Sequence, residues 1–225
     1  MKELSQYFDH TILKPEATEA DIIKLCIEAR DYEFYAICVN SSYVALAKKE
    51  LAGSHVKIAS VVGFPLGACT TATKVFEAKN AIQNGADEID MVIHVGAMKE
   101  GRINYVLTDI IAVVEACEEK ALVKVILETC LLSEDEIVEA CLLAKNAGAA
   151  FVKTSTGFST SGATSEHVAL MKKTVGSTVK VKAAGGIRDL KTTLAMIKAG
   201  ADRIGASASV GILKEADELK SKMPE

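Results

Sequence analysis

The feature of this sequence that most constrains its fold is a regular alternation of short β-branched runs with longer helical patterns. The runs start every 22 to 34 residues, which is the size of a βα unit. Eight such units predict an α/β fold, a closed (β/α)8 TIM barrel with a short N-terminal extension, in which residues 1–225 form a single domain. The expected strands lie near 10–13, 35–40, 57–62, 88–94, 122–128, 151–156, 180–184 and 203–206, and the expected helices near 18–31, 42–52, 72–84, 103–120, 134–147, 165–175, 189–199 and 208–221.

An internal repetition supports this order of elements. The segments 84–89, 147–151 and 199–204 each place Gly-Ala between a helical pattern and a strand, and glycine suits the left-handed residue that ends a helix. The alternative fold is an open doubly wound sheet. It is less favoured because no GxGxxG follows the first strands.

Charge and composition restrict the class of partner. The net charge is −4, the pI is about 5.7, and no run of Lys and Arg occurs, so we expect no nucleic-acid partner. The beginning of the sequence lacks an apolar signal-peptide core, and no run of eighteen apolar residues occurs, so we expect no membrane span. The expected partner is a small molecule, and we expect a homodimer or a higher homo-oligomer.

The six cysteines and four histidines do not form a metal-binding pattern. No CxxC pair, HxH or HxxxH occurs, so we expect no metal site. Most cysteines lie in apolar runs, as buried free thiols do, which favours a cytoplasmic location. The sequence also lacks a GxSxG nucleophile elbow, so a hydrolase triad is not expected.

Two lysines late in neighbouring strands are the main catalytic candidates. Active sites of such barrels lie at the carboxyl ends of the strands. Lys57 and Lys180 begin their strands and can extend to solvent, whereas Lys153 and Lys182 lie further along and at matching heights. One buried lysine is ordinarily a structural ion pair. Two adjacent ones favour catalysis, because burial and a like charge depress the lysine pKa and Schiff-base chemistry needs a neutral amine.

Asp90 is the third candidate, since its strand is otherwise apolar and a buried carboxylate must be paired or hydrogen-bonded. It can be a counter-ion to a lysine or a proton shuttle, and the sequence does not separate the two roles.

A phosphate-binding candidate follows the seventh and eighth strands. Glycines in 184–189 and small residues in 205–209 let backbone N–H groups approach an anion at a helix start.

The residues resemble the deoxyribose-phosphate aldolase family over nearly the whole chain. The resemblance implies a class I aldolase without a cofactor, which reversibly cleaves 2-deoxy-D-ribose 5-phosphate to D-glyceraldehyde 3-phosphate and acetaldehyde through a lysine Schiff base. The segments that carry it are DHTILK at 9–14, ICV at 37–39, VVGFPLG at 61–67, GADEIDMV at 85–92, KVILET at 124–129, FVKTSTG at 151–157, VKAAGGIR at 181–188 and RIGAS at 203–207.

The resemblance also implies a role for individual residues. Lys153 would form the Schiff base, Lys182 would lower its pKa and help to move protons, and Asp90 would be the acid/base partner. The expected substrate-binding residues are Asp9, Thr11, Cys38, Lys124, Thr156, Gly157, Gly185, Gly186, Arg188, Gly205 and Ser207.

Two positions depart from the pattern of some relatives, which carry a lysine where Phe158 stands and a serine where Ala208 stands. Thr160 or Ser161 can substitute in the phosphate site.

The residues alone leave three alternative functions open. These are another Schiff-base sugar-phosphate aldolase or transaldolase, a phosphate-binding barrel isomerase that forms no imine, and a non-catalytic sugar-phosphate binder.

Overall fold

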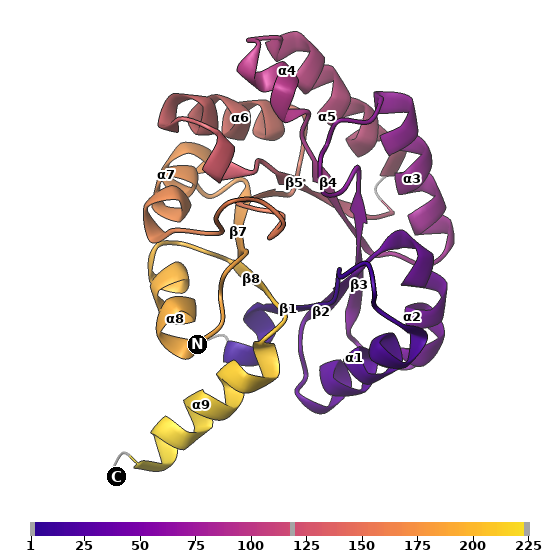
Figure 1. Cartoon of the computed structure of the whole chain (residues 1–225), viewed down its shortest axis with the longest axis vertical. Coiled ribbons are helices and arrows are strands. Elements are labelled where there is room, and N and C mark those ends of the chain that lie inside the picture. The colour runs from indigo at the N-terminus through magenta and orange to yellow at the C-terminus, as the bar shows by residue number, and fades with distance from the viewer. Residues whose placement is uncertain (1–2, 118–119, 223–225) are drawn as a thin grey trace.

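The computed structural model describes residues 3–117 and 120–222, and within them eight parallel strands close into a barrel in chain order (Figure 1). The predicted (β/α)8 fold is therefore confirmed. The 3₁₀ turn η1 (Leu4–Tyr7) precedes the barrel as the predicted N-terminal extension. The strands are β1 (Phe8–Thr11), β2 (Ala36–Val39), β3 (Lys57–Val62), β4 (Glu88–Val92), β5 (Leu122–Ile126), β6 (Phe151–Lys153), β7 (Lys180–Ala184) and β8 (Arg203–Ala206).

Helices surround the barrel on its outer side (Figure 1). Capping boxes start two of them, at Thr18 with Asp21 and at Ser133 with Glu136, and each box satisfies backbone N–H groups of the first turn. The helices are α1 (Glu19–Asp31), α2 (Val44–Glu50), α3 (Thr71–Gln83), α4 (Val95–Lys99), α5 (Ile103–Cys117), α6 (Glu134–Asn146), α7 (Ser165–Val175), α8 (Leu190–Lys198) and α9 (Ser209–Lys222), with 3₁₀ turns η2 (Ser41–Tyr43) and η3 (Thr129–Leu131).

The structure corrects several predicted boundaries. Strand β1 starts two residues earlier than expected, because the buried Phe8 pairs in register with Ile204 of β8. Four other strands end earlier than predicted, since their last residues already turn into loops at the carboxyl end of the barrel. The short helix α4 was not predicted, and His94 caps it by accepting from the backbone N–H of Ala97. Residues 118 and 119, within the predicted helix 103–120, lie outside the described residues.

The repeated Gly-Ala elements behave as the sequence predicts. Gly85, Gly148 and Gly200 have φ values of +110°, +82° and +111° and lie between a helix and the following strand. This backbone region disfavours residues with a Cβ. The three glycines therefore let the chain reverse tightly from helices α3, α6 and α8 into β4, β6 and β8.

Apolar and charged side chains occupy different parts of the fold. A large apolar core lies between the strands and the surrounding helices, whereas a smaller cluster groups Leu13, Cys38, Ala59 and Val61 with Phe64. Buried charged residues on neighbouring strands are paired in register, including Asp90 with Lys124 and Lys153 with Lys182. Within the described ranges no helix combines the length and the apolar character needed to cross a bilayer.

Candidate active site

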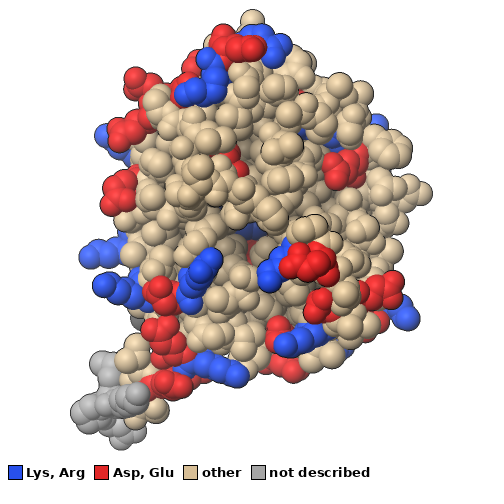
Figure 2. Space-filling model, in the orientation of Figure 1, with Lys and Arg blue, Asp and Glu red and all other residues tan. Residues whose placement is uncertain are grey.

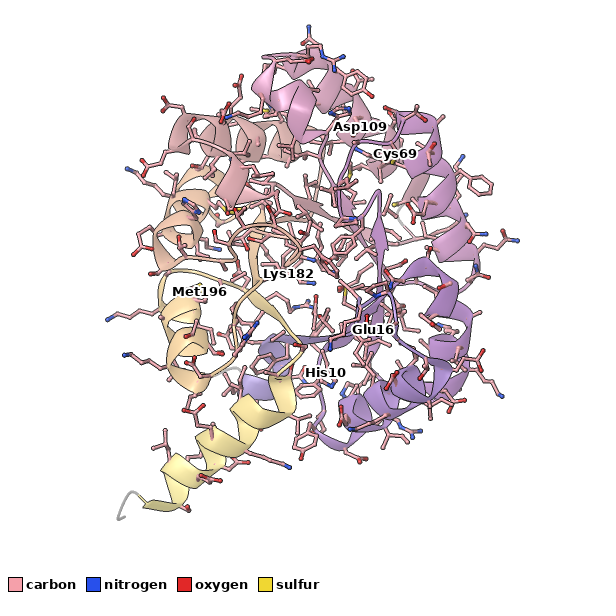
Figure 3. The ribbon with its side chains drawn as sticks, viewed as in Figure 1. His10, Glu16, Cys69, Asp109, Lys182 and Met196 are labelled. Atoms are coloured by element: carbon pink, nitrogen blue, oxygen red, sulfur yellow. The ribbon has the colours of Figure 1, made fainter. Side chains whose placement is uncertain are left out.

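The centre of the site is a carboxylate shared by lysines from neighbouring strands. Lys153 on β6 and Lys182 on β7 are partners in strand register, as their predicted matching heights require. Both ammonium groups lie 2.8 Å from the same oxygen, Oδ2 of Asp90 on β4. In Figure 3, Lys182 lies near the centre of the barrel. The three catalytic candidates are therefore in direct contact.

Asp90 also binds a third lysine. Its Oδ1 accepts from Nζ of Lys124 at 2.7 Å, so both carboxylate oxygens are engaged. Burial alone would raise the pKa of Asp90, but the positive charges of the three lysines outweigh it and hold the pKa well below its usual range. Asp90 is therefore a stable anion, as a counter-ion to lysine must be.

A further set of charges supports these groups. Asp9 on β1 accepts from Lys182 and, at 2.6 Å, from the guanidinium of Arg203 on β8. Glu88 on β4 lies 2.5 Å from Nζ of Lys124. The guanidinium of Arg203 also stacks 3.6 Å from the ring centroid of Tyr35. Each buried cation thus has a carboxylate partner, which buried charges require.

The two central lysines differ in their electrostatic environment. Burial lowers the pKa of Lys153, and the neighbouring Lys182 lowers it further, although Asp90 opposes both effects. Burial would also lower the pKa of Lys182, but Asp9 and Asp90 together raise it. Mutual repulsion alone predicts a depressed pKa for both. The second carboxylate at Lys182 explains why only Lys153 is shifted towards the neutral amine.

A cavity of about 720 Å³ opens above this cluster at the carboxyl ends of the strands. Figure 2 shows a hollow near the centre of this face, with charged atoms visible at its bottom. Among the described residues of the cluster, Lys153 is the one that lines the cavity. Asp90 and Lys182 are fully buried beneath it. A molecule in the cavity therefore contacts Lys153 before it can reach Asp90 or Lys182.

The predicted substrate-binding residues fall into two groups. The group that lines the cavity consists of Thr11, Thr156, Gly157, Gly185, Gly186, Arg188, Gly205 and Ser207. Asp9, Cys38 and Lys124 instead have fully buried side chains, and the cavity wall does not include them. The ammonium group of Lys124 does not reach the cavity wall, because it binds the buried carboxylates of Glu88 and Asp90.

One wall of the cavity suits an anion. Gly185 and Gly186 have φ values of +89° and +76°, and helices α8 and α9 begin shortly after the 185–188 and 205–207 segments. A helix start has a positive dipole end and N–H groups that lack intrahelical acceptors. At the start of α8 the N–H groups of Leu190 and Thr192 already donate to the carboxylates of Glu215 and Asp189, so the donors of this wall come from the loop backbone rather than from those two groups. The exposed Arg188 lies in the same wall. These features supply the donors that a phosphate group needs.

The departures at positions 158 and 208 change this wall in a defined way. Phe158 is half exposed, lines the cavity and meets Phe64 edge to face with ring centroids 5.3 Å apart. Ala208 is partly buried and packs against the apolar core. Thr160 and Ser161 are exposed and are not part of the cavity wall. An aromatic contact thus occupies the place where some relatives carry a lysine.

Some residues of the site were not predicted from the sequence. The loop after β1 and the first turn of α1 also line the cavity, through residues 12–14, 16–17 and Asp21. The position of the loop directly after a strand was the available signal, but its exposed charged residues, Lys14 and Glu16, are also typical of an ordinary surface loop. Glu88 and Arg203 were also missed. Each lies two positions before a selected residue, Asp90 or Gly205, so the period of two along a strand could have identified them.

Two of the four histidines, His10 and His94, have structural contacts. His10 lies 2.8 Å from a carboxylate oxygen of Glu28, and His94 caps α4. Across residues 3–117 and 120–222 there is no group of three or more His, Cys, Asp and Glu side chains arranged to hold a metal ion.

Comparisons with known proteins agree in one family. Residues 4–224 match the family model described as "DeoC/LacD family aldolase". The deoxyribose-phosphate aldolase of Clostridium tetani is 58% identical over 214 residues, 95% of this chain and 99% of that protein. The enzyme of Alkaliphilus oremlandii is 59% identical over 212 residues, 94% and 96% of the two chains. The tetrameric deoxyribose-phosphate aldolase structure from Aeropyrum pernix is 34% identical, covers 96% of this chain and 92% of its own, and has a TM-score of 0.90.

Proposed function

Because this chain belongs to the DeoC/LacD family of aldolases, we propose that it reversibly cleaves 2-deoxy-D-ribose 5-phosphate to D-glyceraldehyde 3-phosphate and acetaldehyde. The observation that carries the proposal is the position of Lys153. Lys153 lines the cavity, and its amine contacts Asp90 at 2.8 Å and has a pKa lowered by burial and by Lys182. This is the environment that an imine-forming lysine needs.

The first half of the reaction is imine formation. The lone pair of neutral Lys153 attacks the C1 aldehyde of the open-chain sugar, and the resulting carbinolamine loses water to give a protonated imine. Lys182 remains an ammonium ion, because Asp9 and Asp90 raise its pKa, and it supplies the proton that converts the leaving hydroxyl into water. Asp90 contacts both nitrogen atoms and transfers protons between them, directly or through a water molecule.

The second half is cleavage of the carbon–carbon bond. The protonated imine accepts the electron pair of the C2–C3 bond while the C3 hydroxyl gives its proton, through a water molecule, to Lys182, which is neutral after its earlier donation. This releases glyceraldehyde 3-phosphate and leaves an enamine on Lys153. Lys182 then protonates C2, and water that adds to the resulting imine returns a proton to Lys182 as acetaldehyde leaves and the Lys153 amine is restored. No metal or organic cofactor takes part in these proposed steps. The phosphate end lies against the 185–188 and 205–207 wall, where N–H groups and Arg188 neutralise its charge.

Buried residues act without touching the sugar in this proposal. We propose Lys124 as a permanent counter-ion of Asp90, because its ammonium group also binds Glu88. Asp9 orients Lys182 in the same way. Cys38 lies beneath the cavity with its Sγ 4.0 Å from Asp90, where burial raises the pKa of the thiol. It packs beside Asp90 as a neutral group.

We further propose that residues 1–225 act as one catalytic domain, in the cytoplasm and as a homo-oligomer. The barrel uses strands from the whole described chain, and all six cysteines are free thiols, as a reducing compartment favours. A tetrameric structure is known for the Aeropyrum pernix relative. Light scattering that gives a monomer mass at micromolar concentration would contradict the oligomer.

Borohydride trapping tests the proposed function. The protein is incubated with 2-deoxyribose 5-phosphate, reduced, digested and mapped by mass spectrometry. We expect a reduced adduct on the peptide that contains Lys153, with the mass of the sugar phosphate or of the two-carbon fragment. The control variant is Lys180→Met, which should still form the adduct on the Lys153 peptide, since Lys180 is an exposed lysine at the start of β7. An enzyme that binds the substrate and forms no adduct would instead support a barrel isomerase.

A further inference from the structure

Glu128 has an unusual backbone conformation beside the cavity. It lies two residues beyond β5, with φ +57° and ψ +60°, in the left-handed region that residues with a side chain occupy at a steric cost. Glycine would avoid that cost. The Glu128 side chain is also buried, although a glutamate is ordinarily exposed. A buried side chain on a strained backbone indicates that its contacts maintain both features.

The Glu128 carboxylate holds the segment that follows β6. Its Oε1 accepts from the backbone N–H of Thr156 at 3.2 Å, and its Oε2 accepts from the Thr156 hydroxyl. That hydroxyl in turn accepts from the backbone N–H of Phe158 at 3.1 Å. One carboxylate thus fixes a three-residue turn, Thr156–Gly157–Phe158, and all three residues line the cavity.

These contacts change the expected role of Thr156. A threonine hydroxyl has one proton to donate, and Thr156 donates it to Glu128. It therefore has no proton left for a phosphate oxygen, which is an acceptor. The contribution of Thr156 to binding lies in the turn that it helps to form.

The Thr156–Phe158 turn packs against Gly185, which belongs to the anion-binding wall of the cavity. A Cβ on Gly185 would lie 3.4 Å from the Cα of Gly157 and 3.0 Å from the Cα of Gly162, so the segments after β6 and β7 are closely packed. The backbone N–H of Ala163 also donates to the carbonyl of Gly185 at 3.0 Å. A shift of the Thr156–Phe158 turn would therefore displace the Gly185–Gly186 backbone, which is part of the anion-binding wall.

We propose that Glu128 is a positioning residue that, through Thr156, sets the affinity of this wall for the phosphate end of the substrate. This inference rests on the proposed function for the identity of the substrate. Glu128 is separate from the three carboxylates that bind the barrel lysines, namely Asp9, Glu88 and Asp90. Its removal should therefore weaken phosphate recognition more than the chemistry at Lys153.

Steady-state kinetics with two substrates test this role. For 2-deoxyribose 5-phosphate, Glu128→Ala should raise KM about tenfold or more and change kcat by less than about threefold. The preference for this substrate over 2-deoxyribose, measured as the ratio of the two kcat/KM values, should fall at least about fivefold. Glu128→Gln keeps one acceptor for the Thr156 N–H and should lie between the wild type and Glu128→Ala. The matched control is Glu134→Ala at an exposed carboxylate in the first turn of α6, and its ratio should stay at the wild-type value.

A double-mutant cycle tests whether the effect passes through Thr156. Thr156→Val should reproduce the loss seen in Glu128→Ala, and the double variant should be no worse than either single variant. Thr156→Ser retains the hydroxyl and should restore the ratio. Additive losses, or equal losses with both substrates, would overturn the proposal. If Glu128→Ala does not fold, the same comparison of substrates with Glu128→Gln and Thr156→Val decides the question.

A binding measurement separates this inference from the proposed function. The affinity for inorganic phosphate is measured by calorimetry for the wild type, Glu128→Ala and Glu134→Ala. Weaker phosphate binding in Glu128→Ala alone supports the positioning role, even if the wild type does not cleave 2-deoxyribose 5-phosphate. In that case only the proposed function fails. Equal phosphate affinity in all three proteins would overturn the positioning role.

Discussion

Replacing Lys182 by methionine removes a positive charge beside the proposed nucleophile and leaves a side chain of similar length. Both lysine nitrogens lie 2.8 Å from the same Asp90 oxygen, so they cannot be farther apart than twice that distance. At this separation two unit charges interact by about 3 kcal/mol for an effective dielectric constant of about 20. That energy corresponds to roughly two pH units in the titration of Lys153.

The sign of the effect follows from the charged form. An ammonium neighbour disfavours protonated Lys153, so its removal raises the pKa of Lys153 and reduces the free amine at neutral pH. Asp90 would then have fewer cationic partners and would stabilise protonated Lys153 more strongly, which also raises the pKa of Lys153. The acid limb of the pH profile of kcat/KM should move to higher pH by about two units. The maximal rate should also fall, by ~100- to 10,000-fold, because a proton donor is lost.

The assay is the pH dependence of kcat/KM for 2-deoxyribose 5-phosphate, with the pH dependence of borohydride trapping as an independent readout. Lys180→Met removes the same charge from the exposed start of the same strand and should leave the acid limb in place. Lys182→Arg keeps the charge and should leave the limb nearer to that of the wild type. An acid limb in Lys182→Met that coincides with the wild type would refute electrostatic coupling between the two lysines.

Three further predictions concern the nucleophile, acid stability and the thiols. Lys153→Arg keeps the charge but cannot form the imine, so turnover should fall at least about a thousandfold and the borohydride adduct should disappear. The pKa of Asp9 is held low by its cationic partners despite burial, so its stabilisation is present above about pH 4 and is lost as the pH falls towards the folded-state value. The difference in urea midpoint between the wild type and Asp9→Asn should accordingly be large at pH 7 and shrink below pH 4. Burial raises the pKa of the Cys141 thiol to about 12, whereas hydrogen bonds from the 159–161 segment lower the pKa of the Cys130 thiol despite its partial burial. Iodoacetamide at pH 8 should therefore label Cys130 first, as measured by peptide mass spectrometry.

The sequence predicted the barrel because its signal is repeated eight times. Strand and helix periods, the glycine reversals and the register of Lys153 with Lys182 all follow from local chemistry. The cavity-lining loops after β6, β7 and β8 followed from the rule that barrel sites lie at the carboxyl ends of strands, whereas the loop after β1 was not predicted. The individual roles of the site residues stay predictions that the experiments above must test.

The sequence was less informative where the structure depends on distant contacts. The sequence does not reveal that the ammonium group of Lys124 contacts Glu88 and Asp90 on the neighbouring strand β4. The raised pKa of Lys182 depends on Asp9, which is 173 positions away in the chain. Neither contact has a local signal in the sequence. The strained backbone of Glu128 likewise depends on Thr156 in the following βα unit.

The charge balance of the whole cluster explains why one amine can be neutral. Three carboxylates, Asp9, Glu88 and Asp90, face four cations, so full protonation leaves one excess positive charge in a buried place. Loss of the proton from Lys153 removes that excess. The imine that forms is again a cation, but Lys182 has then given its proton to the leaving hydroxyl, so the cluster stays balanced. The buried charges therefore favour the free amine of Lys153 over its ammonium form and accommodate one cationic imine.

This balance predicts that Glu88→Gln acts in the opposite direction to Lys182→Met. Replacing a carboxylate by a neutral amide of the same shape increases the excess positive charge and leaves Lys124 with fewer anionic partners. The pKa of Lys153 should then fall further, and the acid limb of kcat/KM should move to lower pH. The shift should be smaller than that of Lys182→Met, because Glu88 contacts Lys124 and acts on Lys153 only at a distance. Opposite shifts in the two variants require a long-range electrostatic origin, since general disruption of the site would move both in the same direction. A shift to higher pH in Glu88→Gln would therefore rule out the charge-balance explanation and leave only the direct repulsion between Lys153 and Lys182.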